Sequence, residues 1–158
     1  YVRLFSAALA KTPNDPYLHF MLATHLNSLG RLPEALTHFD EAYGLSPDSD
    51  IGLQGLEKKA DLLFRQKNFK EAAAAAQSLL VIDPENVMAK TIFASLHLLS
   101  GQLDQSIELL RDILASKVKA RFGISLAMPN YLLGQAYKLK GETEKAQACL
   151  DEYARLKG

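Results

Sequence analysis

The chain lacks the features of a disulfide-bonded or membrane-spanning protein. Its 158 residues include no tryptophan and one cysteine, Cys149, so no disulfide can form within it. We interpret Cys149 as a small packed or surface residue rather than a nucleophile. This cysteine usage favours a cytoplasmic protein and is also compatible with a periplasmic or membrane-anchored parent protein. No run of about 18 apolar residues is present, so we expect no direct membrane insertion.

The chain also lacks an excess of charge of either sign. Its 18 Lys and Arg residues balance its 18 Asp and Glu residues, which leaves a formal net charge of zero. A nucleic-acid-binding protein needs a basic stripe that displaces counterions from phosphates. The one basic run, Lys117, Lys119 and Arg121, is interpreted as a solvated helix end rather than as a phosphate or partner contact. We therefore expect no nucleic-acid partner.

Catalytic signatures are absent as well. The chain has no glycine-rich phosphate loop, no His-Glu-x-x-His, no paired cysteines and no Gly-x-Ser-x-Gly. His19 and His25 are six residues apart, on different faces of a helix, so we expect no shared metal ion. Glu57 and Asp61 are one helical turn apart and could form an acid–base pair. With Arg65 nearby, we interpret them as the wall of a polar groove, and we expect no enzyme activity, metal site or cofactor.

What the chain does contain is a repeated segment. The stretch Leu-Gly-Arg-Leu-Pro-Glu-Ala-Leu at 29–36 recurs in variant form at 99–107 and 139–146, and without its glycine at 65–73. A small residue follows each turn, and its successive copies are 37, 34 and 40 residues apart. These residues are Ala35, Ala72, Ser106 and Ala146. A base period of 34 with insertions of 3 and 6 fits these steps and predicts one helix–turn–helix unit per copy.

The residues around these turns resemble those of the tetratricopeptide repeat family over nearly the whole chain. Two copies carry the family pattern best: Leu22-Ala23, Gly30, Ala35, Phe39, Ala42 and Pro47 in one, and Leu133-Gly134, Tyr137, Gly141 and Ala146 in the other. The family's tryptophan is absent. Lys59 stands where a packed leucine is expected, so either this lysine snorkels or the local register is shifted by one residue. His97 lies at a packing position and is interpreted as a hydrogen-bonded core histidine.

The resemblance implies an all-α fold, a right-handed superhelical solenoid of antiparallel helix pairs. We expect helices at 16–29 with 33–45, 51–66 with 69–81, 87–99 with 103–119 and 127–140 with 143–156. One repeat domain would span 1–158. It would comprise the second helix of a preceding partial repeat at 1–15, repeat one at 16–49, repeat two at 53–86, repeat three at 87–120, an insertion at 121–126, and repeat four with its capping helix at 127–158. Because the chain starts within a repeat, we expect it to belong to a longer protein.

Local signals predict how the helices cross and turn. Each helix pair should cross closely at one small residue on its first helix, namely Ala23, Ala60, Ala94 or Gly134. Gly30, Gly101 and Gly141 can adopt the left-handed conformation that ends a helix. Asn68 should do so in the copy that lacks glycine, because Asn tolerates this conformation better than most residues.

The resemblance also implies a binding surface. In this family the first helices of successive repeats line a concave groove that holds peptides or helices. The groove-facing positions carry Tyr17, Phe20, Thr24, Asn27, Gln54, Glu57, Asp61, Phe64, Arg65, Thr91, Ser95, Tyr131, Gln135 and Lys138. We expect Phe20, Phe64 and Tyr131 to be exposed as anchors for a partner, although such residues can also pack between repeats. Glu57 and Asp61 should repel an acidic chaperone tail, the ligand of one well-known subfamily.

Three functions remain open at this stage. The first is a non-catalytic protein–protein interaction scaffold that binds a peptide or helix of a partner in the groove. The second is self-assembly into a homo-oligomer through an uncovered apolar face at residues 1–13, which carries Leu4, Phe5, Ala8 and Leu9. The third is an accessory domain of a larger enzyme or of a biogenesis or secretion complex. The insertion near Ser116–Leu126 is a further candidate contact region.

Overall fold

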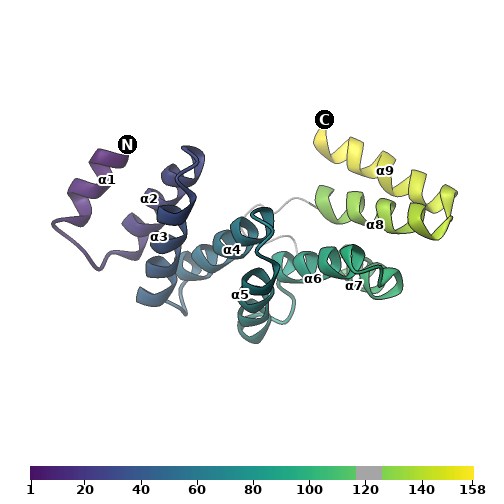
Figure 1. Cartoon of the computed structure of the whole chain (residues 1–158), viewed down its shortest axis with the longest axis horizontal. Helices are drawn as coiled ribbons and strands as arrows, with labels where there is room; N and C mark the ends of the chain where they lie inside the picture. Colours follow the sequence, from purple (N-terminus) through teal and green to yellow (C-terminus); the bar gives the residue numbers. More distant parts are fainter. Residues whose placement is uncertain (117–125) are drawn as a thin grey trace. The chain divides into compact units, whose positions relative to one another are not determined.

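A computed structural model describes residues 1–116 and 126–158, and all regular secondary structure within these ranges is α-helical (Figure 1). The helices are α1 (Val2–Leu9), α2 (Pro16–Ser28), α3 (Leu32–Leu45), α4 (Asp50–Arg65), α5 (Phe69–Ile82), α6 (Val87–Leu99), α7 (Leu103–Ala115), α8 (Ala127–Lys140) and α9 (Thr143–Lys157). The predicted all-α repeat fold is confirmed. Among the described residues, no helix has the length and apolar character needed to span a membrane.

The chain divides into two compact units, whose boundary lies within α5. The N-terminal unit spans Tyr1–Ala75 and the C-terminal unit spans Ala76–Gly158. In the N-terminal unit, α2 packs on α1, α3 and α4. In the C-terminal unit, α7 packs on α6 and α8, while α8 also packs on α6 and α9. We call α2, α4, α6 and α8 the first helices, because each one opens a helix pair.

Each unit has its own apolar core. In the N-terminal unit, α1 contributes Leu9 to a cluster with residues of α2, α3 and α4, including Phe39 and Leu62. The core of the C-terminal unit is built from α6, α7, α8 and α9. The predicted close crossing at Gly134 is confirmed, because a Cβ atom there would lie 2.9 Å from the Leu150 side chain. Ala23, Ala60 and Ala94 are fully buried, as their predicted crossing positions require.

Three of the four first helices, α2, α4 and α6, begin with side-chain caps that the sequence encodes locally. Asp15 Oδ1 accepts hydrogen bonds from the backbone N–H groups of Tyr17 and Leu18 at 2.9 and 3.2 Å. Ser49 caps α4 and Asn86 caps α6 in the same way. These bonds satisfy amide groups that have no partner inside the helix, so they fix where each of these three helices starts.

The turns after the first helices confirm three predictions and correct a fourth. Gly30, Gly101 and Gly141 have φ of 75°, 77° and 78°. In the copy without glycine, the left-handed residue is Lys67, with φ 61°, and not Asn68 as predicted. The reason is the hydrogen-bond register: Asn68 N–H donates to the Leu63 carbonyl at 3.0 Å, as the residue after each turn glycine does in the other copies. Position 67 is therefore the equivalent of the glycines.

Two glycines that were not predicted from the sequence lie where α4 approaches α3 and the residue that follows it. A Cβ atom on Gly52 would overlap the carbonyl oxygen of Ser46. A Cβ atom on Gly55 would lie 3.0 Å from the Phe39 carbonyl oxygen. The present backbone therefore requires glycine at position 52, and a Cβ atom at position 55 would require a small shift of α3.

Two predicted extensions differ from the structure. Helix α1 ends at Leu9, short of the predicted range 1–15 of the partial repeat, and α7 ends at Ala115 rather than 119. Ser116 has an extended backbone, with ψ 132°, which stops the helical hydrogen-bond pattern. The predicted insertion at 121–126 and the basic run at 117–121 fall almost wholly on residues 117–125, outside the described part of the chain.

Candidate functional site

Each first helix has one face with positions spaced at i, i+3, i+7 and i+11, and most of these positions belong to the predicted groove set. Residues with this spacing lie on the same side of an α-helix. We call these four positions the stripe of the helix. The stripes are Tyr17, Phe20, Thr24 and Ser28 in α2; Gln54, Glu57, Asp61 and Arg65 in α4; Met88, Thr91, Ser95 and Leu99 in α6; and Met128, Tyr131, Gln135 and Leu139 in α8. Because α2 packs on α4 and α6 packs on α8, each unit has two neighbouring stripes.

In the N-terminal unit the structure brings three predicted site residues together. Arg65 of α4 donates through Nη2 to Asn27 Oδ1 of α2 at 3.5 Å. The Nε atom of Arg65 forms an ion pair with Asp61 Oδ2 at 3.1 Å. These groups are substantially exposed to solvent, so the pair contributes little to stability but gives this surface a polar character.

The three predicted aromatic anchors differ in their exposure. Phe20 is half-buried, and its ring meets that of the fully buried Phe39 edge-on, with centroids 5.8 Å apart. Phe64 is half-buried against Phe69, at 5.4 Å. Tyr131 is 37% exposed, although its ring also lies 5.2 Å from Tyr153 of α9. Phe20 and Phe64 thus contribute to helix packing, and Tyr131 has the most accessible ring of the three predicted anchors.

The interpretation of Glu57 as part of the wall of a polar groove is wrong, because this residue is only 4% exposed. Its position in the α4 stripe faces packed neighbours rather than solvent. Asp61, the other predicted carboxylate, is paired with Arg65. The predicted repulsion of an acidic chaperone tail therefore depends on a single paired carboxylate. The exclusion of an acidic chaperone tail as a partner stays a prediction.

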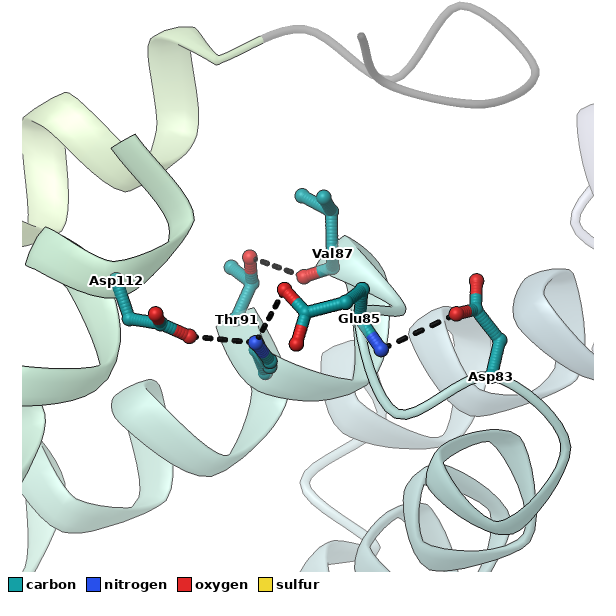
Figure 2. Close-up of polar contacts among 6 residues, drawn as sticks. Asp83, Glu85, Val87, Thr91 and Asp112 are labelled. Atoms are coloured by element: carbon teal, nitrogen blue, oxygen red, sulfur yellow. Dashed lines mark hydrogen bonds and ion pairs between the residues drawn. The ribbon is translucent and has the colours of Figure 1, made fainter. Parts of the chain in front are cut away.

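Several predicted polar residues have their hydroxyl groups bonded to their own helix. In α6, Thr91 Oγ1 donates to the Val87 carbonyl at 2.7 Å, and Ser95 Oγ donates to the Thr91 carbonyl at 2.8 Å; Figure 2 shows the first of these bonds. Thr24 Oγ1 donates to the Phe20 carbonyl at 2.9 Å. Ser95 is also buried, so it offers little surface to a partner. The other predicted site residues vary: Tyr17 and Lys138 are exposed, and Gln54 and Gln135 are half-buried.

Lys90 forms an ion-pair network that the sequence analysis did not anticipate. Its Nζ atom lies 2.9 Å from Glu85 Oε2 and 2.5 Å from Asp112 Oδ2. In Figure 2, dashed lines run from the carboxylates of Glu85 and Asp112 to one shared nitrogen atom. Burial lowers the pKa of Lys90, but the hydrogen bonds to Asp112 and Glu85 outweigh it, so the pKa is raised overall. The network links the segment before α6 to α7. Lys90 occupies in α6 the repeat position that Leu56 occupies in α4. A lysine at an apolar repeat position was the sequence signal for a buried charge, and such a charge needs carboxylate partners.

The other residues discussed from the sequence, Lys59, His97 and Cys149, are all partly buried. Lys59 is half-buried, and its Nζ atom reaches Asp40 Oδ1 at 2.5 Å, so this lysine snorkels while the register stays unshifted. His97 is hydrogen-bonded as expected, to Gln102 Oε1 at 2.6 Å, but it is half-buried rather than in the core. Burial raises the pKa of the Cys149 thiol, which lowers the fraction of reactive thiolate.

A hollow of about 550 Å³ lies in the C-terminal unit between α7 and the α8–α9 turn. Lys140 on its wall pairs with Asp104 at 2.6 Å, and Lys145 pairs with Glu142 at 2.5 Å. Lys145 also lies over the Tyr137 ring, 5.4 Å from its centroid. Each of these four charges is therefore paired within the chain.

The α6 and α8 stripes expose large apolar side chains. Leu99, Met128, Tyr131 and Leu139 have between 37% and 65% of their surface accessible. Leu99 and Leu139 occupy the same stripe position, at the end of α6 and of α8. In the N-terminal unit this position holds Ser28 in α2 and Arg65 in α4. The two units therefore present stripes that differ in chemistry at their C-terminal ends, one polar and one apolar.

Comparisons with known proteins agree with this repeat architecture. Tetratricopeptide repeat family models match residues 2–50, 63–126 and 129–158. No curated protein matches the chain in sequence.

Solved structures resemble the fold over almost its whole length. MamA 41-end from Desulfovibrio magneticus RS-1 superposes with a TM-score of 0.73 at 18% identity, covering 99% of this chain and 83% of that chain. TTC0263, a thermophilic tetratricopeptide repeat protein of Thermus thermophilus, has a TM-score of 0.69 at 20% identity, with 98% and 80% covered. BtubC (BKLC) from P. vanneervenii has a TM-score of 0.71 at 21% identity, with 98% and 71% covered. At these identities the similarity shows the fold alone.

Proposed function

The chain belongs to the tetratricopeptide repeat family, whose members are generally non-catalytic scaffolds for protein interactions, and we propose that its α6 and α8 stripes bind an amphipathic helix of a protein partner. The observation that carries this proposal is the exposure of Leu99, Met128, Tyr131 and Leu139. Large apolar side chains gathered on neighbouring helices lose contact with water when a partner covers them.

The chemistry of the stripes favours a helical ligand. Since all regular structure in the described ranges is helical, they offer no strand edge to which an extended peptide could add by backbone pairing. An amphipathic helix presents apolar side chains at i, i+3 or i+4, and i+7, and these can lie along the α8 stripe. Tyr131 supplies a ring of the kind that is enriched at binding hot spots, and Met128 supplies a flexible side chain that adapts to shape.

A helical-peptide library displayed on phage tests the proposal. Peptides selected on the wild-type chain should have apolar residues at helical spacing. The double variant Leu99→Ser with Leu139→Ser should bind them at least about tenfold more weakly, because the two leucines are exposed and their loss removes contact area rather than core packing.

The matched control is Leu29→Ser with Val81→Ser, which removes two exposed apolar side chains outside the stripes. It should leave peptide affinity unchanged, and all variants should keep the wild-type melting temperature. Equal weakening by both double variants, or no weakening by either, would contradict the proposal.

Self-assembly is a second candidate, supported by one observation. In α1, Leu4 is exposed at 63%. Phe5 and Leu9, which were also expected to be uncovered, instead pack on the core of the N-terminal unit. If α1 mediates association, Leu4→Lys should shift sedimentation toward monomer at high concentration. A chain that is monomeric at every concentration would exclude self-assembly through this face.

A further inference from the structure

A pair of histidines in the N-terminal unit has a hydrogen-bond arrangement that changes with pH. His19 of α2 and His38 of α3 face each other through their Nδ1 atoms, which are 3.0 Å apart. The other ring nitrogen of His19, Nε2, lies 2.9 Å from the carbonyl oxygen of Pro13. His19 is 9% exposed and His38 is half-buried. The pair thus joins the segment before α2, α2 itself and α3.

The partners determine which nitrogens carry hydrogen. A carbonyl oxygen can only accept, so His19 must be protonated at Nε2. In neutral His19 the Nδ1 atom then has a lone pair, and His38 donates to it from Nδ1–H. One further proton can enter the pair at His38 Nε2 without breaking this bond. A second would place an N–H group on each side of the 3.0 Å contact, where no acceptor remains.

The groups around the pair set how readily it takes up protons. Burial lowers the pKa of His38, and His19 lowers it further, whereas Glu41 and Glu34 of α3 act in the opposite direction. Glu34 is held by Arg31 at 2.5 Å. In the neighbouring α4, Lys59 is paired with Asp40, and Asp15 before α2 is engaged in capping.

We infer that the His19–His38 pair is an acid-sensitive latch, which holds α2 to α3 and to Pro13 at neutral pH and releases them on acidification. In the opened state each of the two imidazoles can take up a proton, whereas the closed pair accommodates at most one. Acid therefore favours the opened state. By proton linkage, the stability of the closed state falls with falling pH wherever the opened state binds more protons.

The C-terminal unit contains a natural reference for this latch. His19 lies four residues before the small crossing residue of its helix, and Lys90 lies four residues before the crossing residue of α6. Lys90 joins the segment before α6 to α7 through Glu85 and Asp112, which parallels the way His19 joins Pro13 to α3. No histidine is among these three residues, so we expect their network to stay closed between about pH 7 and 5.

Hydrogen exchange of the 158-residue chain, expressed as protection factors, tests the latch. Between about pH 6.5 and 5, opening of the α1–α3 amides should increase about tenfold, because each proton taken up only by the opened state contributes up to a factor of about ten per pH unit. Opening of the α6–α9 amides should change less than about threefold. His38→Gln should reduce the α1–α3 increase below about threefold, since the Gln amide can either donate to neutral His19 or accept from protonated His19.

His97→Gln is the matched control, because His97 bonds Gln102 in the other unit, and it should keep the full increase in α1–α3. Should His38→Gln fail to fold, nitrogen NMR of the wild-type imidazoles provides the second readout. The rings should take up their two protons one after the other. Equal acid responses of wild type and His38→Gln, or two rings that take up their protons independently of each other, would overturn the inference.

Discussion

The two units place different chemistry at the same position of the repeat. Four residues before the crossing of each first helix, α2 has His19, α4 has Leu56, α6 has Lys90 and α8 has Asn130. All four are buried. The polar ones find partners in different ways: His19 in a histidine and a carbonyl, Lys90 in two carboxylates, and Asn130 in the Leu126 carbonyl. The repeat therefore requires a buried residue at this position, but it does not specify which partners the polar side chain binds.

The units also differ in where their helices approach most closely. In the N-terminal unit the close contact is between successive pairs, where Gly52 of α4 meets the backbone at Ser46. In the C-terminal unit it is within a pair, where Gly134 of α8 meets the Leu150 side chain. A backbone neighbour cannot move aside as a side chain can, which leads to unequal predictions for the two glycines.

The largest expected effect is that of Gly52→Ala. The added methyl group would overlap a backbone carbonyl and force α4 away from α3, so unfolding free energy should fall by about 3 kcal/mol. Urea denaturation followed by circular dichroism measures the change. Gly134→Ala is the matched control and should cost less than about 1 kcal/mol, because Leu150 can rotate and alanine favours the helix. Similar losses in both variants would remove the distinction drawn between the units.

Gly134→Leu should have the next largest effect. A leucine side chain cannot fit where Cβ alone would lie 2.9 Å from Leu150, and overpacking of this kind costs about 2 kcal/mol. The expected readout is a lower urea midpoint with local loss of protection in α8 and α9. Lys138→Leu, at an exposed position of the same helix, should leave the midpoint nearly unchanged. A stable Gly134→Leu variant would show that the crossing lies elsewhere.

Lys90→Met tests whether the ion-pair network stabilises the C-terminal unit. Methionine replaces the buried apolar part of the lysine side chain but has no charge that can pair with Glu85 and Asp112. We expect the free energy of unfolding to fall by about 1 kcal/mol at neutral pH. Since the pKa of Lys90 is raised on folding, its contribution is complete below pH 10.5 and is lost as the pH rises through the higher folded value. The wild type should therefore weaken in alkali more than the variant does. An identical alkaline response would exclude the network as the cause.

The smallest expected effect is an increase in stability. Lys67 has a left-handed backbone, which costs a residue with a Cβ atom about 1 kcal/mol relative to glycine, so Lys67→Gly should raise unfolding free energy by up to that amount. Gln66→Gly is the control, because φ at Gln66 is −76° and glycine there only adds flexibility to the unfolded chain. Thermal denaturation distinguishes the two. Stabilisation by neither variant would mean that the side chain of Lys67 compensates for its backbone.

Features that depend on a local signal could be predicted from the sequence. The proline after Asp15, the turn glycines and the small crossing residues each act on neighbours within a few positions, so helix bounds followed to within a few residues. Contacts between side chains that are far apart in the sequence could not be predicted. The pairing of Lys90 with Asp112 joins residues 22 positions apart, and the burial of Glu57 depends on the packing of whole helices. Periodicity specifies neither.

The amino-acid sequence by itself determined the repeat frame and the all-α fold, because apolar spacing and turn residues recur at a nearly fixed period. Tertiary structure alone decided which stripe residues reach solvent. It placed Phe20 against Phe39 and left Tyr131 exposed, although both were predicted as anchors on the same face of their helices. It also brought His19 to His38. The reason is physical: burial and hydrogen bonding depend on what the neighbouring helix presents, and that is set by how the helices pack.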